Sequence, residues 1–203
     1  MLKTRVTEKL GIEYPIIMGA MANISTPNFV GAASEAGCLG ILASTNYQSE
    51  KDFIDAIERT KTLTPKPFGV NLSTFPARIP VNNLSYLNIL IIEGVKVVET
   101  SGFGIPNELL PRLQEAQKAG ITWIHKCTGL RYARKAASLG ADMVTVVGYE
   151  NGGATGILDI GTFVLIPTVA RALNIPVIGG GGITNGSGLV AALALGAEAV
   201  IMG

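Results

Sequence analysis

Short apolar runs recur along the chain at even spacing, and polar or glycine-rich segments separate them. Most runs are continuous rather than alternating, which indicates strands that are covered on both faces, as in a parallel sheet. We therefore expect eight strands, at Tyr14–Met18, Leu39–Ala43, Phe68–Asn71, Val95–Glu99, Ile121–Lys126, Met143–Gly148, Val177–Gly179 and Ala199–Met202.

The segments between these runs predict helices. Several of them close on a glycine just before the next strand, such as Gly37 and Gly140, and glycine there suits the left-handed conformation that ends a helix. Thr26 before Pro27 is typical of a helix start. We expect helices at Pro27–Ala36, Glu50–Thr62, Asn83–Glu93, Pro106–Ala119, Gly129–Leu139, Thr162–Leu173 and Gly186–Leu195.

Strands that alternate with helices predict parallel βαβ units and an α/β fold. Eight units predict a (β/α)8 TIM barrel. An open doubly wound sheet is the alternative, but eight units fill residues 1–203 as a single domain and leave no linker or second domain. The sequence stops at Gly203, at the end of the eighth expected strand. We therefore expect a fragment of a longer chain, without the eighth helix and the C-terminal segment.

The composition excludes several classes of protein. The 203 residues carry 16 Lys+Arg against 15 Asp+Glu, and this balance argues against a nucleic-acid partner. No apolar run reaches the ~18 residues of a membrane span, and no secretory signal begins the chain. Two cysteines are too few for a disulfide framework. We expect a cytoplasmic protein that acts on a small molecule, with a homo-oligomer left open.

The strongest local signal is a run of four glycines, Gly179–Gly182, after the seventh strand. Backbone N–H groups without side chains can close around a phosphate, and barrels often bind phosphate with the loops after strands seven and eight. A tight turn that packs a helix on a strand is the alternative. We favour phosphate, and we expect Gly181→Val to place a Cβ in the path of that phosphate.

The fifth strand ends in three residues that could carry chemistry, His125, Lys126 and Cys127. Lys126 suits either a solvated barrel rim or a cation that faces an anionic or electron-rich cofactor, and we favour the cofactor. Because strand residues alternate, His125 then points toward the helices, which favours packing over catalysis. Cys127 is interpreted as a buried, inert thiol rather than one that a cation activates.

Segments spread over the whole chain carry a further pattern when they are taken in order. These segments are Pro15–Ala22, Ser34–Ile41, Pro67–Asn71, Ile124–Thr128, Gly140–Gly153, Pro176–Ile183, Ala191–Ala197 and Met202-Gly203. Together they resemble the nitronate monooxygenase (2-nitropropane dioxygenase) family of FMN-dependent TIM-barrel oxidoreductases. That family also contains NADH:quinone reductases and enoyl-acyl-carrier-protein reductase II.

The resemblance implies FMN across the top of the barrel and oxidation of nitronates with O2. Two alternatives stay open, an NAD(P)H-dependent flavin reductase of quinones or enoyl thioesters, and a flavin-binding barrel without turnover. NAD(P)H is thus a candidate electron donor. The cofactor-binding residues that the resemblance implies are Ala20, Met21 and Ala22 at the flavin ring, Asn71 and Lys126 as hydrogen-bond donors, Glu150, Gly152 and Gly153 along the cofactor, and Gly181, Gly182 and Gly203 at the phosphate.

One position departs from the family pattern. The usual motif after strand six runs Glu-x-Gly-Gly-His or Glu-x-Ala-Gly-His, and here Ala154 stands where the histidine would be. In the family this histidine is the base of nitronate oxidation. The sequence therefore assigns no catalytic residue, and the departure leaves the implied flavin site intact.

Overall fold

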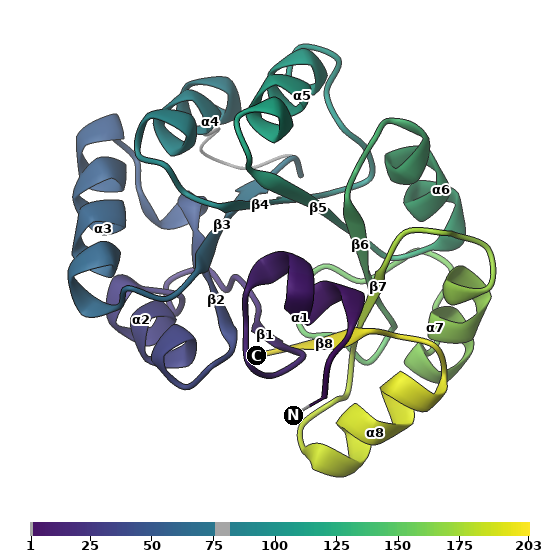
Figure 1. The fold of residues 1–203 in the computed structure, drawn as a ribbon. Coiled ribbons are helices and arrows are strands. Elements are labelled where there is room, and N and C mark those ends of the chain that lie inside the picture. Colours follow the sequence, from purple (N-terminus) through teal and green to yellow (C-terminus); the bar gives the residue numbers. More distant parts are fainter. Residues whose placement is uncertain (1, 76–81) are drawn as a thin grey trace.

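The protein is described here by a computed structural model that covers residues 2–75 and 82–203. Eight parallel strands pair in sequence order and close into a barrel, with β8 returning to pair with β1 (Figure 1). The predicted TIM barrel is confirmed. Its strands are β1 (Ile16–Met18), β2 (Leu39–Ala43), β3 (Phe68–Ser73), β4 (Val97–Ser101), β5 (Thr122–Cys127), β6 (Met143–Val147), β7 (Val177–Gly180) and β8 (Ala199–Met202).

Some strand ends differ from the expected ones by a few residues. β1 begins at Ile16 rather than Tyr14, because Pro15 has no N–H to give to a ladder and Tyr14 bonds outside the sheet. β3 and β4 continue past their expected ends to Ser73 and Ser101, which pair with each other. This extension carries two hydroxyl side chains to the mouth of the barrel.

Helices surround the strands, and Figure 1 shows them as an outer ring. The seven expected helices are all present, each with ends shifted by a few residues. The largest shift is in α5, which begins at Leu110 because the residues from Pro106 form a separate turn. The helices are α2 (Pro27–Glu35), α3 (Glu50–Leu63), α4 (Asn83–Ile92), α5 (Leu110–Lys118), α6 (Leu130–Ser138), α7 (Thr162–Ala170) and α8 (Gly186–Ala194), with a short 3-10 turn η1 (Ser44–Asn46).

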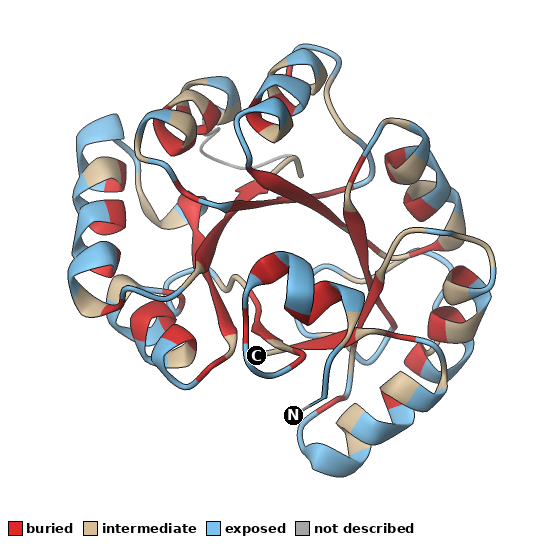
Figure 2. Cartoon of the chain, in the orientation of Figure 1, coloured by how far each residue is buried: buried red, intermediate tan, exposed pale blue. Residues whose placement is uncertain are grey.

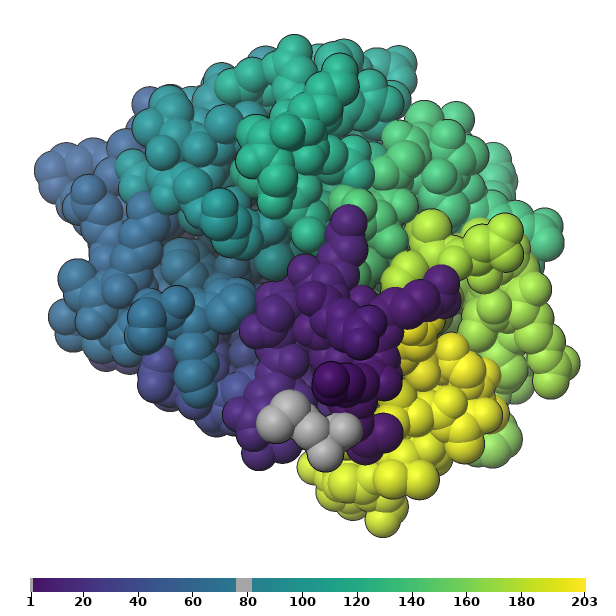
Figure 3. Space-filling model, in the orientation of Figure 1, coloured from purple at the N-terminus to yellow at the C-terminus, as the bar shows by residue number. Residues whose placement is uncertain are grey.

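One further helix, α1 (Arg5–Leu10), was not expected from the sequence and lies across the end of the barrel where the strands begin (Figure 1). Thr4 and Thr7 cap it reciprocally, and Gly11 ends it in a left-handed conformation. Val6 and Leu10 are buried against the barrel interior. The N-terminal residues therefore fill the centre of this face of the molecule (Figure 3).

Alternation along the strands divides the core into two shells. Side chains such as Ile17, Ile41 and Ile124 point inward and pack on one another inside the barrel. Side chains such as Trp123 and Val144 point outward and pack under the helices. Figure 2 shows the result, with buried strands and helices that are buried only along their inner faces. The open end of the barrel, where the strands finish, is left for a site.

We expect Leu10→Ala to destabilise the protein by about 2 to 5 kcal/mol, because it leaves a cavity where α1 closes the barrel. Lys3→Ala is the control, since Lys3 is exposed just before the helix and surface changes cost within about 0.5 kcal/mol. Urea unfolding of both variants measures the difference. Equal midpoints for the two variants would show that α1 does not belong to the core.

Candidate active site

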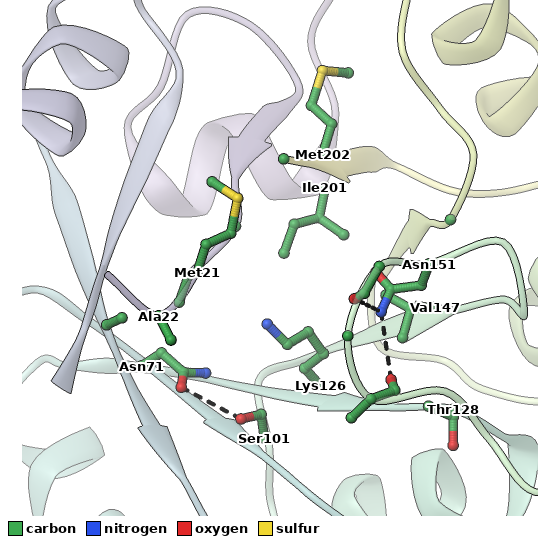
Figure 4. Close-up of a pocket in the computed structure, with 18 of the residues that line it drawn as sticks. Met21, Ala22, Asn71, Ser101, Lys126, Thr128, Val147, Asn151, Ile201 and Met202 are labelled. Atoms are coloured by element: carbon green, nitrogen blue, oxygen red, sulfur yellow. Dashed lines mark hydrogen bonds between the residues drawn. The ribbon is translucent and has the colours of Figure 1, made fainter. Parts of the chain in front are cut away.

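A cavity of about 720 Å³ opens where the strands end. All eleven residues that the resemblance assigns to the cofactor line this cavity, and Ala154 lines it as well. They come from the ends of β1, β3, β5, β6, β7 and β8, so residues far apart in sequence meet at one site (Figure 4). The barrel geometry thus brings the whole predicted set together, while its role toward a cofactor stays a prediction.

The glycine run turns sharply as it leaves β7. Gly181 and Gly182 have φ values of +103° and +69°, which residues with a Cβ rarely adopt. The N–H groups of Gly182 and Gly203 donate to no other group of the described residues, and both glycines line the cavity. These donors, with no side chain in front of them, suit a phosphate.

We expected a Cβ at position 181 to point toward the phosphate in the cavity, and this expected direction is wrong. A Cβ on Gly181 would lie 2.5 Å from Thr162 Oγ1 and 3.0 Å from the backbone nitrogen of Gly148. It would thus collide with Thr162 at the start of α7 and with Gly148 after β6, neither of which lines the cavity. The turn needs glycine because the backbone conformation and the packing behind it exclude a side chain.

Glu150 links the loop after β6 to the start of α7. Its carboxylate accepts hydrogen bonds from the backbone N–H of Thr162, at 2.9 Å, and from the Thr162 hydroxyl, at 2.8 Å. Backbone hydrogen bonds, its own and that of Thr162, lower the pKa of Glu150 despite the opposing effect of burial. Glu150 is therefore an ionised cap that holds the cavity wall in place.

Lys126 extends from β5 into the cavity between Met21 and Asn151 (Figure 4). Its Nζ lies 2.9 Å from Glu99 Oε1, and Asn71 Nδ2 donates to the same oxygen at 2.7 Å. The favoured prediction for Lys126, a cation facing the site, agrees with this position. Sequence reasoning missed Glu99, although a lone acidic residue within an apolar strand was a visible signal.

Ala20, Met21 and Ala22 form one wall of the cavity, and Met202 lies nearby at the end of β8 (Figure 4). The Ser25 hydroxyl accepts a hydrogen bond from the Met21 N–H at 2.9 Å, which fixes this loop after β1. Small and apolar side chains here leave room for a flat ring system.

His125 faces away from the cavity, as the alternation of the strand predicted. It is fully buried, and its Nδ1 lies 2.9 Å from Thr100 Oγ1, which also accepts a hydrogen bond from Trp123 Nε1 at 2.8 Å. Burial lowers the pKa of His125 to about 4. The packing position favoured for His125 is confirmed, but the ring is only half satisfied, because its Nε2 is buried without a partner among the described residues.

Stability should fall as the pH drops from about 6.5 toward 4. The unfolded histidine binds its proton near pH 6.5 and the folded His125 only near pH 4, so the unfolded state holds more protons between these values. The neutral, buried His125 therefore contributes roughly 3 kcal/mol to the free energy of unfolding above pH 6.5, and this contribution is lost as the pH falls to 4. Urea unfolding at pH 7 and pH 4.5 measures it, and His125→Asn should flatten the difference. An unchanged pH dependence in that variant would contradict the assignment.

Cys127 is buried at the end of β5, and burial raises the pKa of its thiol to about 12. The buried position of Cys127 agrees with its interpretation as an inert thiol, and burial opposes activation by Lys126. Within residues 2–75 and 82–203, no group of three or more His, Cys, Asp or Glu side chains is placed to hold a metal ion.

The comparisons with known proteins agree with this geometry. The family model described as nitronate monooxygenase matches residues 3–203. The chain belongs to the nitronate monooxygenase family. FabK from Thermotoga maritima superimposes on it with a TM-score of 0.88 and 40% identity, over 100% of this chain and 62% of that one.

Two curated relatives show the range of names in the family. A (3aS,4S,5R,7aS)-5-hydroxy-7a-methyl-1-oxo-octahydro-1H-indene-4-carboxyl-CoA dehydrogenase from Rhodococcus jostii is 39% identical over 202 residues, which is 100% of this chain and 54% of the relative. A probable nitronate monooxygenase from Staphylococcus saprophyticus is 32% identical over 242 residues, 100% of this chain and 67% of the relative. The chain thus spans about half the length of the first of them. None of the helices described here is long and apolar enough to cross a membrane.

Proposed function

We propose that the protein is an FMN-dependent oxidoreductase that acts on a small molecule. The cavity at the ends of the strands supports this function, because it joins three features at one mouth. These are a glycine turn with open N–H donors, a polar floor with Lys126 and Asn71, and a wall of small and apolar side chains from β1. Each feature matches one part of the cofactor: the phosphate, the polar edge of the ring, and the ring face.

In this proposal, Gly182 and Gly203 hold the phosphate through their N–H groups, and Gly181 shapes the turn that presents them. Gly152 and Gly153 leave open space along the cavity, since a Cβ on either would meet nothing within 4 Å. Bound FMN supplies hydride and single-electron transfer, which none of the chain's own side chains can provide. The side chains around it orient the cofactor and the substrate.

Two reactions are candidates, and the family supports both. Oxidation of nitronates with O2 is the first, and reduction of enoyl thioesters or quinones by NAD(P)H is the second. Ala154 argues against turnover of a neutral nitroalkane, because alanine cannot take its proton, but a nitronate is already deprotonated and needs no base. Glu150 is a poor substitute base, since its carboxylate is occupied by Thr162 and its pKa is lowered. The relative from Rhodococcus jostii is named a carboxyl-CoA dehydrogenase, which supports a CoA thioester as one class of substrate to test.

A flavin spectrum of the purified protein tests the proposal directly. We expect FMN to copurify or to bind on addition, and to be bleached anaerobically by NADH, NADPH or ethylnitronate. Bleaching by a nicotinamide alone selects the reductase, and bleaching by the nitronate alone selects the oxidase. If FMN binds but none of the three reductants bleaches it, the protein is a flavin-binding barrel without turnover. Absence of any FMN binding would overturn the proposal.

A further inference from the structure

A carboxylate lies buried beneath the floor of the cavity. Glu99 sits in the middle of β4 with 1% of its surface exposed. Its strand neighbours on the same face are Val97, which packs inside the barrel, and Ser101, which lines the cavity. Glu99 therefore points into the barrel, one layer below the site.

Asn71 and Lys126, the two polar side chains of the cavity floor, both contact the Glu99 carboxylate. Asn71 Nδ2 donates to Glu99 Oε1 at 2.7 Å, and Lys126 Nζ lies 2.9 Å from the same oxygen. The side chain of Lys126 is 20% exposed, so the ion pair is largely shielded from water. The other oxygen, Glu99 Oε2, is buried and has no partner among the described residues.

Burying a carboxylate inside a barrel is costly unless it is paired, and leaving one oxygen without a partner adds to that cost. Packing alone would favour an apolar residue between Val97 and Ser101. The contacts of Glu99 have a different consequence, since they set where the charge and the amide of the cavity floor point. The Ser101 hydroxyl lies 3.4 Å from Asn71 Oδ1 and fixes the other end of the amide.

The charge of Glu99 also offsets the charge of Lys126. The two charged groups lie 2.9 Å apart where little water screens them, so the carboxylate substantially changes the electrostatic potential above Lys126. A lone lysine would favour a ligand that gains negative charge. The ion pair leaves the floor nearly neutral while Lys126 keeps N–H donors for the cavity.

We propose that Glu99 is a positioning residue that fixes Lys126 and Asn71 beneath FMN and lowers the reduction potential of the bound flavin by compensating the Lys126 charge. This inference rests on the proposed function, because it requires FMN in the cavity. Glu99 itself does not line the cavity and touches neither cofactor nor substrate in this role.

The test compares Glu99→Gln with wild type in two measurements, FMN affinity by fluorescence titration and midpoint potential by equilibration with a reference dye. Glutamine keeps an oxygen that can accept from Asn71 but removes the charge. We expect the dissociation constant of FMN in Glu99→Gln to stay within about threefold of the wild-type value. We expect the equilibrium between oxidised and reduced bound FMN to shift at least tenfold toward the reduced form. That factor corresponds to a potential about 30 mV higher for a two-electron couple.

Two further variants separate this role from packing. Thr145→Val alters a buried side chain of β6 that pairs in register with Lys126, has an unpartnered hydroxyl and carries no charge, so it should leave the potential unchanged. Glu99→Asp keeps the charge but shortens its reach, so it should weaken FMN binding more than threefold and raise the potential less than Glu99→Gln does. This variant also keeps the inference testable if Glu99→Gln fails to fold, because wild-type affinity in Glu99→Asp would overturn the positioning role.

The outcomes show whether the role of Glu99 or the proposed FMN-dependent function fails. If wild type binds FMN and Glu99→Gln has an unchanged potential, the inference is wrong and the proposed function stands. An equal shift in Thr145→Val would also overturn it, because packing would then explain the effect. If wild type binds no FMN, both are wrong.

Discussion

Ala154→His should raise the rate of anaerobic flavin reduction by neutral nitroethane at least 100-fold. A positioned general base contributes about 10²- to 10⁴-fold, and wild type has alanine at the place where the family carries its histidine. Ala154 lines the cavity and is exposed there, so a larger side chain has room. The Asn151 side chain donates to the Ala154 carbonyl at 3.4 Å, which helps to hold the loop. Stopped-flow absorbance of the bound flavin measures the rate.

Ethylnitronate provides the internal comparison, because it is already deprotonated and should reduce the flavin in wild type and variant at similar rates. Ala154→Gln is the matched control, since it adds a polar side chain of similar size that cannot act as a base. Fast oxidation of neutral nitroethane by wild type would show that position 154 does not limit the chemistry. An equal gain in Ala154→Gln would show that size rather than basicity matters.

Gly181→Val is expected to lower FMN content at least tenfold and to destabilise the protein. Valine cannot readily adopt a φ of +103°, and its Cβ would lie 2.5 Å from Thr162 Oγ1. That hydroxyl donates to Glu150 and lies within hydrogen-bond distance of the Gly181 carbonyl, so the collision displaces the turn that carries the Gly182 N–H from the start of α7. Flavin content per purified protein and the thermal midpoint measure the two effects.

Gly186→Ala is the matched control, because a Cβ on Gly186, at the start of α8, would meet nothing within 4 Å. It should keep both flavin content and stability close to wild type. Full flavin content in Gly181→Val would mean that the turn after β7 does not hold the cofactor. A loss of flavin in Gly186→Ala as well would mean that the effect is not specific to the turn.

Several functional residues were accessible to sequence reasoning because local rules place them. Alternation along β5 determines that Lys126 and His125 face opposite sides, and the end of each strand determines which loops reach the mouth. Sequence reasoning did not identify Glu99, because its role depends on Lys126 of β5 and Asn71 of β3. These side chains converge on Glu99 only when the three strands lie side by side. The direction of a Cβ at Gly181 was predicted wrongly because it depends on the start of α7.

The sequence by itself determined the eight alternating units, the seven helices of the ring, and the set of residues at the mouth of the barrel. The strands and helices follow from short-range patterns, in which each apolar run, glycine stop or cap reports its own segment, whereas the residues at the mouth follow from the resemblance and from the strand ends. Only the tertiary structure decided that α1 closes the opposite end, that Glu150 caps α7 through Thr162, and that Glu99 supports the cavity floor. A six-residue helix is too short to show a period, and the contacts between distant side chains depend on how neighbouring strands align in the closed barrel, which no single segment reports.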